Sequence, residues 1–375
     1  MRGLYLGYDG KIPAGTLFQL SCNSPDGVLC AKLEWLRWDI QETSNTLPFF
    51  RLFLSPRLKR VALYNSSVFG EAQLTGLVQI VSVLPTSLEG LTIMCGLEEE
   101  KYLKDAISTF ICRCGSSLRD FCSRVPLSET AIHRITQLPN LRSWTIVQGP
   151  PRIVPPSIFP SLKELRLLEQ AALKWLPLFA SHEGAILQND FTPATSHADT
   201  RETLRFLTCL NDTPLDSTLL SSILKFRNLV TLYINTYCSE EEGCVFRLTD
   251  DGMGDLAAAL PRLKCLQLGR PCCSSSCNTT VASLLSISTH CLDLTVLETH
   301  FNTLTIVGDM EHLLGKGLGR NKAKCELRNF VVGYSPLEVG GEDIDIVVTG
   351  FKFIFPCLTD FTDYGGHWRR LSSKL

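Results

Sequence analysis

Cysteines are the residues of this chain whose chemistry and spacing most directly suggest a site. Sixteen are present, and Cys272, Cys273 and Cys277 lie within the single run CCSSSC. Two of these thiols, together with His290 and Cys291, would supply the four ligands that a structural zinc ion takes. The spacing matches no well-known zinc finger, however, and a core role at a helix end also explains His290 and Cys291. We therefore predict no metal and no cofactor, and keep a cysteine-based metal-binding protein as the less favoured alternative.

Other patterns that resemble catalytic motifs have simpler explanations. The run LLGKGLGR (313–320) lacks the spacing of a phosphate-binding loop and follows a predicted helix rather than a strand, so a turn at a helix end explains it. The chain contains neither G-x-S-x-G nor H-E-x-x-H, and the acidic runs 98–100 and 240–242 fit solvated loops or helix starts. The sequence thus predicts a protein that is not an enzyme.

Composition narrows the classes of partner. The chain has 375 residues, a net charge of −2, 45% hydrophobic residues and 20% charged residues, which is ordinary for a globular protein. A chain without excess positive charge is poorly suited to bind a phosphate backbone, so we expect no nucleic acid. The most apolar long segment, 344–358, is too short to span a bilayer and is interrupted by Asp345 and Lys352. We expect no membrane partner.

Cysteine usage bears on the cellular compartment. The first residues, MRGLYLGYDGKIP, lack the apolar run of a signal peptide, which favours the cytoplasm or the nucleus and reduced thiols. Five cysteines occur within apolar patterns, where a thiol acts as a small buried hydrophobe: Cys209, Cys265, Cys291, Cys325 and Cys357. The even cysteine count leaves a secreted, disulfide-linked chain as an alternative.

The elements that would position any site repeat along the chain. The spacing L-x-x-L-x-L, with other apolar residues in place of some leucines, recurs roughly every 30 residues, near the range of leucine-rich repeats. Its first positions are Leu33, Leu58, Leu88, Leu118, Leu141, Leu162, Leu204, Leu229, Leu263, Leu294, Leu327 and Leu358. The end of each copy alternates like a short strand.

Helical patterns precede most of these strands. They cover 74–84, 130–138, 215–226 and 281–291, and a fifth begins near Asp250 and stops at Pro261 before Leu263. Proline lacks the N–H that a continuing helix needs, so it ends the helix and turns the chain into the next strand.

Alternating helices and strands with this period predict an α/β leucine-rich-repeat-like solenoid, a horseshoe with parallel strands on the concave face and helices outside. We predict one domain over 1–375, with about twelve irregular repeats from Leu33 and an inserted loop over 181–203. A doubly wound α/β domain is disfavoured, because no glycine-rich phosphate loop follows any predicted strand.

Residues between the apolar strand positions should project from the concave face, because side chains alternate along a strand. Tyr, Arg and Met are among them, and these residue types anchor many interfaces. A mixed-charge row of this kind predicts a protein ligand. The predicted binding residues are Arg37, Asp39, Tyr64, Thr92, Met94, Arg166, Tyr233, Asn235, Gln267, Glu298 and His300.

Three stretches resemble a known family. They are LRWDIQETSNTLPFFRLFLSPRLKRVAL (36–63), HCLDLTVLETHFN (290–302) and the segment from LRNFVVGYSPL to Trp368 (327–368). They are similar to segments of the F-box/leucine-rich-repeat-like proteins that are abundant in mushroom-forming fungi. The resemblance covers nearly the whole chain, and these three stretches carry it. The resemblance implies the substrate-recognition part of an F-box-type ubiquitin-ligase receptor.

The same family would carry an F-box of roughly forty helical residues before the repeats. Residues before Leu33 have neither that length nor an amphipathic helical pattern. We therefore expect a Skp-type adaptor to bind only if an F-box exists upstream. The alternative is a free-standing repeat scaffold without a link to a ligase.

Overall fold

The computed structural model describes most of the repeat elements. The described residues are 2–6, 13–23, 27–39, 44–64, 71–94, 100–147, 161–168, 171, 174–177, 204–211, 217–236, 248–269, 278–315, 325–332, 337, 343–363 and 368–374. The predicted inserted loop 181–203 lies outside them, as do Cys272, Cys273 and Cys277.

Short strands alternate with helices along the chain. The strands are β1 (Gly3–Leu6), β2 (Trp35–Asp39), β3 (Arg60–Tyr64), β4 (Gly90–Met94), β5 (Asp120–Ser123), β6 (Ser143–Ile146), β7 (Glu164–Leu168), β8 (Phe206–Asn211), β9 (Thr231–Thr236), β10 (Cys265–Leu268), β11 (Val296–Glu298), β12 (Asn329–Val331) and β13 (Asp360–Thr362). The helices are α1 (Ala14–Asn23), the 3₁₀ helix η1 (Ser44–Phe53), α2 (Glu71–Val83), α3 (Glu100–Arg113), α4 (Glu129–Thr136), α7 (Ser217–Ile223), α8 (Asp250–Ala259), α9 (Val281–His290), α10 (Ile306–Gly315), α11 (Asp343–Ile354) and α12 (Arg369–Ser372).

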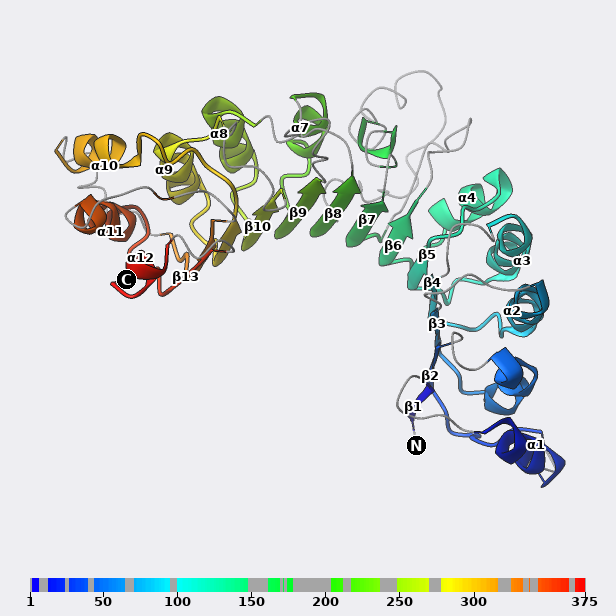
Figure 1. The fold of residues 1–375 in the computed structure, drawn as a ribbon. Coiled ribbons are helices and arrows are strands. Elements are labelled where there is room, and N and C mark those ends of the chain that lie inside the picture. The colour runs from blue at the N-terminus through cyan, green and yellow to red at the C-terminus, as the bar shows by residue number, and fades with distance from the viewer. Residues whose placement is uncertain are drawn as a thin grey trace, which may run out of the picture. The chain divides into compact units, whose positions relative to one another are not determined.

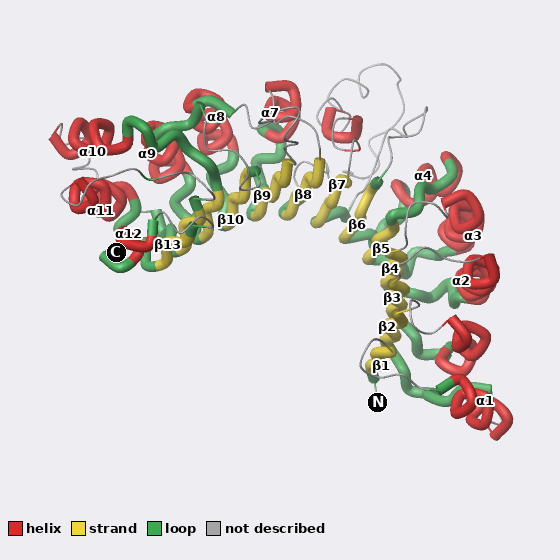
Figure 2. The backbone as a smooth tube through the Cα atoms, viewed as in Figure 1, coloured by secondary structure: helices red, strands yellow, loops and turns green. Residues whose placement is uncertain are grey.

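The described residues form two compact units, the first ending at Arg166 and the second starting at Leu167. In the first unit, strands β1 to β6 pair in chain order, each parallel to the next. In the second unit, β8 to β13 pair in the same way. Within each unit the helices lie along one side of the strands (Figures 1 and 2). This arrangement confirms the predicted parallel strands with helices on one side.

The core of each unit is built from the predicted apolar strand positions. In the copy that forms β2, Leu33 and Leu36 are 0% exposed and Trp38 is 1% exposed. Every one of the twelve predicted copies coincides with one of the strands β2 to β13. Repetition of buried leucines is effective here because each repeat covers the apolar face of its neighbour, which a single repeat could not bury alone.

The structure adds a repeat before the first predicted one. Strand β1 pairs with β2 in the register Gly3↔Trp35, and Leu17 of α1 is 1% exposed. The segment GLYL has only a short alternation and lacks the full L-x-x-L-x-L spacing, which is why sequence analysis did not find it.

Two of the five cysteines expected to be buried are not. Cys357 is exposed and Cys265 is partly exposed, whereas Cys209, Cys291 and Cys325 are buried. Cys265 begins β10 and alternates away from the core side, which Leu266 and Leu268 occupy. Cys357 lies in the turn before β13, where the chain is at the surface.

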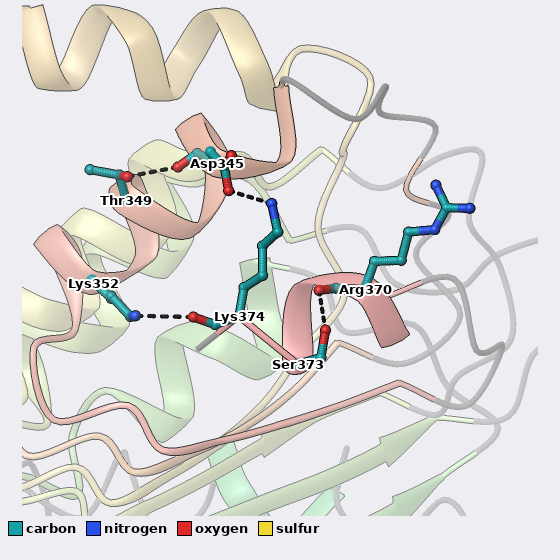
Figure 3. A network of polar contacts seen from close by, with 6 residues as sticks. All are labelled: Asp345, Thr349, Lys352, Arg370, Ser373 and Lys374. Atoms are coloured by element: carbon teal, nitrogen blue, oxygen red, sulfur yellow. Dashed lines mark hydrogen bonds and ion pairs between the residues drawn. The ribbon is translucent and has the colours of Figure 1, made fainter.

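Aromatic side chains fill the last part of the second unit. Trp368 is 0% exposed, and its ring centroid lies 5.0 Å from that of Phe361 and 5.8 Å from that of Phe301. Around this cluster, Lys374 Nζ pairs with Asp345 Oδ1 at 2.5 Å, and Lys352 Nζ donates to the Lys374 carbonyl at 3.1 Å (Figure 3). The segment after β13 is therefore tied both to the core and to helix α11.

Candidate recognition surface

Each strand presents one set of side chains to the core and the alternate set to the side of the sheet without helices, here called the helix-free face. In β2, Leu36 and Trp38 are buried, while Trp35, Arg37 and Asp39 retain exposure. All the residues predicted from the sequence to contact a partner lie in these alternate positions or directly after a strand.

Parallel pairing places the predicted residues of the first unit in two rows. Arg37 and Thr92 occupy one row, on either side of Ala62. Asp39, Tyr64 and Met94 occupy the next row, on consecutive strands β2, β3 and β4. Sequence analysis selected these residues, and the strand pairing shows which of them share a row.

Arg37 is held between two aromatic rings. Its guanidinium carbon lies 4.9 Å from the ring centroid of Tyr5 on β1 and 4.3 Å from that of Tyr64 on β3. A cation over the face of an aromatic ring is attracted by the negative charge density of that face. The Arg37 Nε atom is buried and has no hydrogen-bond partner among the described residues.

An ion pair on the same face joins two strands that are separated by a third strand. Arg60 on β3 forms an ion pair with Asp120 on β5, with 3.1 Å between Nη2 and Oδ2. The strand between them carries Gly90, where a Cβ would lie 3.1 Å from the Arg60 Cγ, so the missing side chain makes room for this path. Burial raises the pKa of the Asp120 carboxyl, and the nearby Arg60 guanidinium opposes that rise.

Two sulfur-containing side chains, Met94 and Cys122, contact each other on the helix-free face of the first unit. The Cys122 thiol on β5 donates to the Met94 sulfur at 3.7 Å, and burial raises the pKa of that thiol. The thiol therefore stays protonated at neutral pH and adds a weakly polar, non-ionised surface beside Thr92, three strands away from Arg37. Arg166 is exposed and pairs with Glu164 of its own strand at 2.7 Å.

Pairing in the second unit places Tyr233, Gln267 and Glu298 in one row across β9, β10 and β11. Asn235 and His300 differ from them because they are only 4% and 5% exposed. The Asn235 amide donates to the Tyr233 hydroxyl at 3.2 Å. Both residues therefore offer little contact area, and Asn235 helps to orient the Tyr233 hydroxyl.

The structure adds residues to the face that sequence analysis did not select. Tyr5, Trp35 and Phe206 are 48%, 37% and 44% exposed and lie at outward positions of β1, β2 and β8. Trp35 and Phe206 are the first residues of β2 and β8, two positions before Arg37 and Thr208. The sequence analysis considered only positions later in each strand. Each directly precedes a buried leucine, Leu36 or Leu207, so the alternation of side chains along a strand would have found both.

No cluster of potential metal ligands occurs within the described part of the chain. Of the possible zinc ligands, Cys272, Cys273 and Cys277 lie outside that part. The Cys291 thiol is buried and donates to the carbonyls of Ala257 and Leu260, at 3.6 and 3.7 Å, which is a core role. None of the described helices has the length and apolar character needed to cross a membrane.

Comparison with known proteins adds likeness of fold only. The chain matches no protein-family model and no curated protein sequence. It resembles the leucine-rich repeat-containing protein LegL7 from Legionella pneumophila, at 12% identity and a TM-score of 0.42, over 90% of this chain and 98% of that one. It also resembles a chain of the Toll–Spatzle complex of Drosophila, at 11% identity and a TM-score of 0.42, over 100% of this chain and 45% of that one. Parallel strands that pair in chain order and alternate with helices in each unit give the chain an α/β leucine-rich-repeat-like solenoid fold.

Proposed function

We propose that this chain is a protein–protein recognition module that binds its partner on the helix-free face. The observation that carries the proposal is the alignment of Tyr64, Met94 and Asp39 in one row and of Tyr233, Gln267 and Glu298 in another. Aromatic, sulfur-containing and charged side chains at adjacent positions provide both contact area and specificity for a protein surface.

A site-specific photocrosslinker tests this proposal. The crosslinking amino acid is placed at Tyr233 on the helix-free face, and in a control variant at Tyr102 of α3, which is 69% exposed. A protein that crosslinks at position 233 and not at position 102 is the expected result. Crosslinking at position 102 alone would overturn the assignment of the binding face.

A double substitution gives a second measurement. Tyr233→Ala with Gln267→Ala removes partly exposed side chains from neighbouring strands, so circular dichroism should remain unchanged. In a pull-down without the crosslinker, recovery of the partner that crosslinking identified should decrease. Unchanged recovery would exclude this row from the interface.

We also propose that the module serves as the substrate-recognition part of an F-box-type ubiquitin-ligase receptor, in the cytoplasm or the nucleus. The resemblance of stretches 36–63, 290–302 and 327–368 supports this role. The free thiols of Cys209, Cys291 and Cys325 fit a reducing compartment.

Adaptor binding tests the ligase role. Strand β1 and helix α1 belong to the repeat array, since β1 pairs with β2 and Leu17 is buried. Because these elements pack in the repeat core, they are not free to form an F-box. We expect no stable complex of residues 1–375 with a Skp-type adaptor, and a complex once an upstream F-box is added from a longer transcript. If no transcript supplies an F-box, the chain is a free-standing scaffold.

A further inference from the structure

Arg37 differs from Arg60 and Arg166 of the same face in forming no ion pair with a described acidic residue. Arg60 pairs with Asp120, and Arg166 pairs with Glu164. Among the ion pairs of the described residues, Arg37 does not occur. Its guanidinium contacts two tyrosine rings, and its Nε has no hydrogen-bond acceptor among the described residues.

The two rings hold the guanidinium, and no described carboxylate forms an ion pair with it. Planar contact with an aromatic face leaves the N–H donors at the edge of the group available for hydrogen bonds. Those donors match the two oxygens of a carboxylate, and such paired, charge-assisted bonds are stronger than bonds between neutral groups. The nearest acid on the same strand is Asp39, which lies in the next row and has an interaction of its own.

Apolar side chains surround this cation. Tyr5 and Trp35 are 48% and 37% exposed, while Tyr64 and Met94 are partly exposed in the adjoining row. A ligand that met the cation would therefore also bury aromatic and sulfur-containing surface. This combination fits a peptide in which an acidic residue is flanked by apolar ones.

The described strands of the second unit carry no such site. The outward positions of strands β8 to β13 carry Glu298 and Asp360 and, within these strands, neither lysine nor arginine. The described strands of the first unit thus supply the cation that an acidic ligand needs, and those of the second unit do not.

We propose that the helix-free face of the first unit binds an acidic peptide segment of a partner protein, with a carboxylate of that segment paired to Arg37 between Tyr5 and Tyr64. This inference rests on the proposed recognition function and specifies the chemistry of the ligand.

Selection from a random peptide library on the purified full chain tests the inference. Peptides that bind should be enriched in Asp and Glu next to apolar residues. Fluorescence anisotropy then measures the affinity of the best selected peptide for the wild type and for Arg37→Met. Because hydrogen bonds to charged groups are lost, the affinity should fall roughly 10- to 100-fold in Arg37→Met.

Two further variants control for charge and for folding. Arg57→Met makes the same change in the exposed turn before β3, and its affinity should equal that of the wild type. Arg37→Lys keeps the charge but loses the planar fork, so its affinity should lie between those of the wild type and Arg37→Met. Binding by the wild type should weaken with added salt, because salt screens the charge pair.

Failure of this inference is distinct from failure of the recognition function. Selected peptides without acidic enrichment, no selected peptide at all, or acidic peptides that Arg37→Met binds as well as the wild type would each overturn the acidic-ligand assignment. If a protein still crosslinks at Tyr233 in that case, the recognition function stands. Loss of both the peptides and the crosslink would overturn both proposals.

Discussion

At the scale of single residues, the buried thiols are built into the packing of the repeats. Cys325 donates to the Cys291 carbonyl at 3.3 Å, and Cys291 donates to carbonyls of the preceding repeat. Burial raises the pKa of Cys209 and of Cys291 to about 12, and that of Cys325 to about 11. These thiols therefore remain protonated in the folded protein at neutral pH.

The raised pKa values predict a loss of stability at high pH. The folded chain keeps a proton on Cys209 that the unfolded chain releases above its ordinary pKa of 9.0, so the contribution to stability is complete below about pH 9 and decreases as the pH rises toward 12. Replacing Cys209 by Val removes this ionisation from a fully buried site. At pH 10 the variant should escape about 1 kcal/mol of the destabilisation that the wild type suffers relative to pH 7.

Urea unfolding at the two pH values, monitored by circular dichroism, measures this difference. Cys22→Val is the matched control, because it makes the same substitution at an exposed position of α1. An identical loss of stability in the wild type and in Cys209→Val would contradict the assigned pKa.

Sequence analysis identified Arg37 and Tyr64 but not their contact. Alternation along a strand decides which face a residue occupies, and this was enough to select both. Their pairing depends on Arg37 turning diagonally toward the row of Tyr64 and on Tyr5, whose strand was not predicted. Side-chain direction within a face is set by neighbouring strands, and a single strand's spacing carries no information about it.

At the scale of elements, helices α8 and α9 are joined through one carboxylate. Asp250 is in the first turn of α8 and accepts hydrogen bonds from the Thr280 N–H at 2.7 Å and from the Thr280 hydroxyl at 2.8 Å. It also accepts one from the Ser283 hydroxyl. The carboxylate thus lies at the N-terminus of α9, where the helix dipole favours a negative charge.

This arrangement predicts unequal roles for two adjacent aspartates. Asp250→Ala removes the acceptor of the Thr280 N–H and of the Thr280 and Ser283 hydroxyls, and should cost about 1–3 kcal/mol of unfolding free energy. Asp251→Ala removes an exposed carboxylate from the same helix turn and should cost under about 0.5 kcal/mol. Chemical denaturation of both variants measures the difference, and equal losses would show that the joint between α8 and α9 contributes nothing.

Sequence patterns predicted the individual elements well where leucines and prolines mark them. The helix before Pro261 and the strand after Leu263 appear as α8 and β10, within the expected limits. The Asp250 joint was not foreseen, because its partners Thr280 and Ser283 lie a full repeat later in the chain. Such contacts depend on how repeats stack, and stacking follows from the fold rather than from local periodicity.

At the scale of the whole molecule, the period of the leucines predicted the solenoid but not its division into units. The boundary falls between Arg166 and Leu167, inside strand β7. The strand pattern Leu162, Leu165, Leu167 runs through this point without interruption, and all three side chains are 0% exposed. A regular local pattern therefore predicts each repeat but does not mark the boundary between the two units.

Because repeats depend mainly on their neighbours, damage at one end of the second unit should remain local. Trp368 is 0% exposed and packs on Phe361, Phe301 and Phe351. Trp368→Ala should cost about 3–5 kcal/mol in the repeats that contact it. Amide hydrogen exchange should therefore accelerate in β12 and β13, while β2 to β5 of the first unit exchange as in the wild type.

Lys374→Ala provides the comparison within the same segment. The Lys374–Asp345 pair is 44% and 68% exposed on its two sides, so its loss should leave exchange in β12 and β13 nearly unchanged. Faster exchange throughout both units in Trp368→Ala would mean that the molecule opens as one cooperative body, and the nearest-neighbour description of its stability would be wrong. Exchange confined to the last repeats would identify the residues after β13 as the element that closes the core of the second unit.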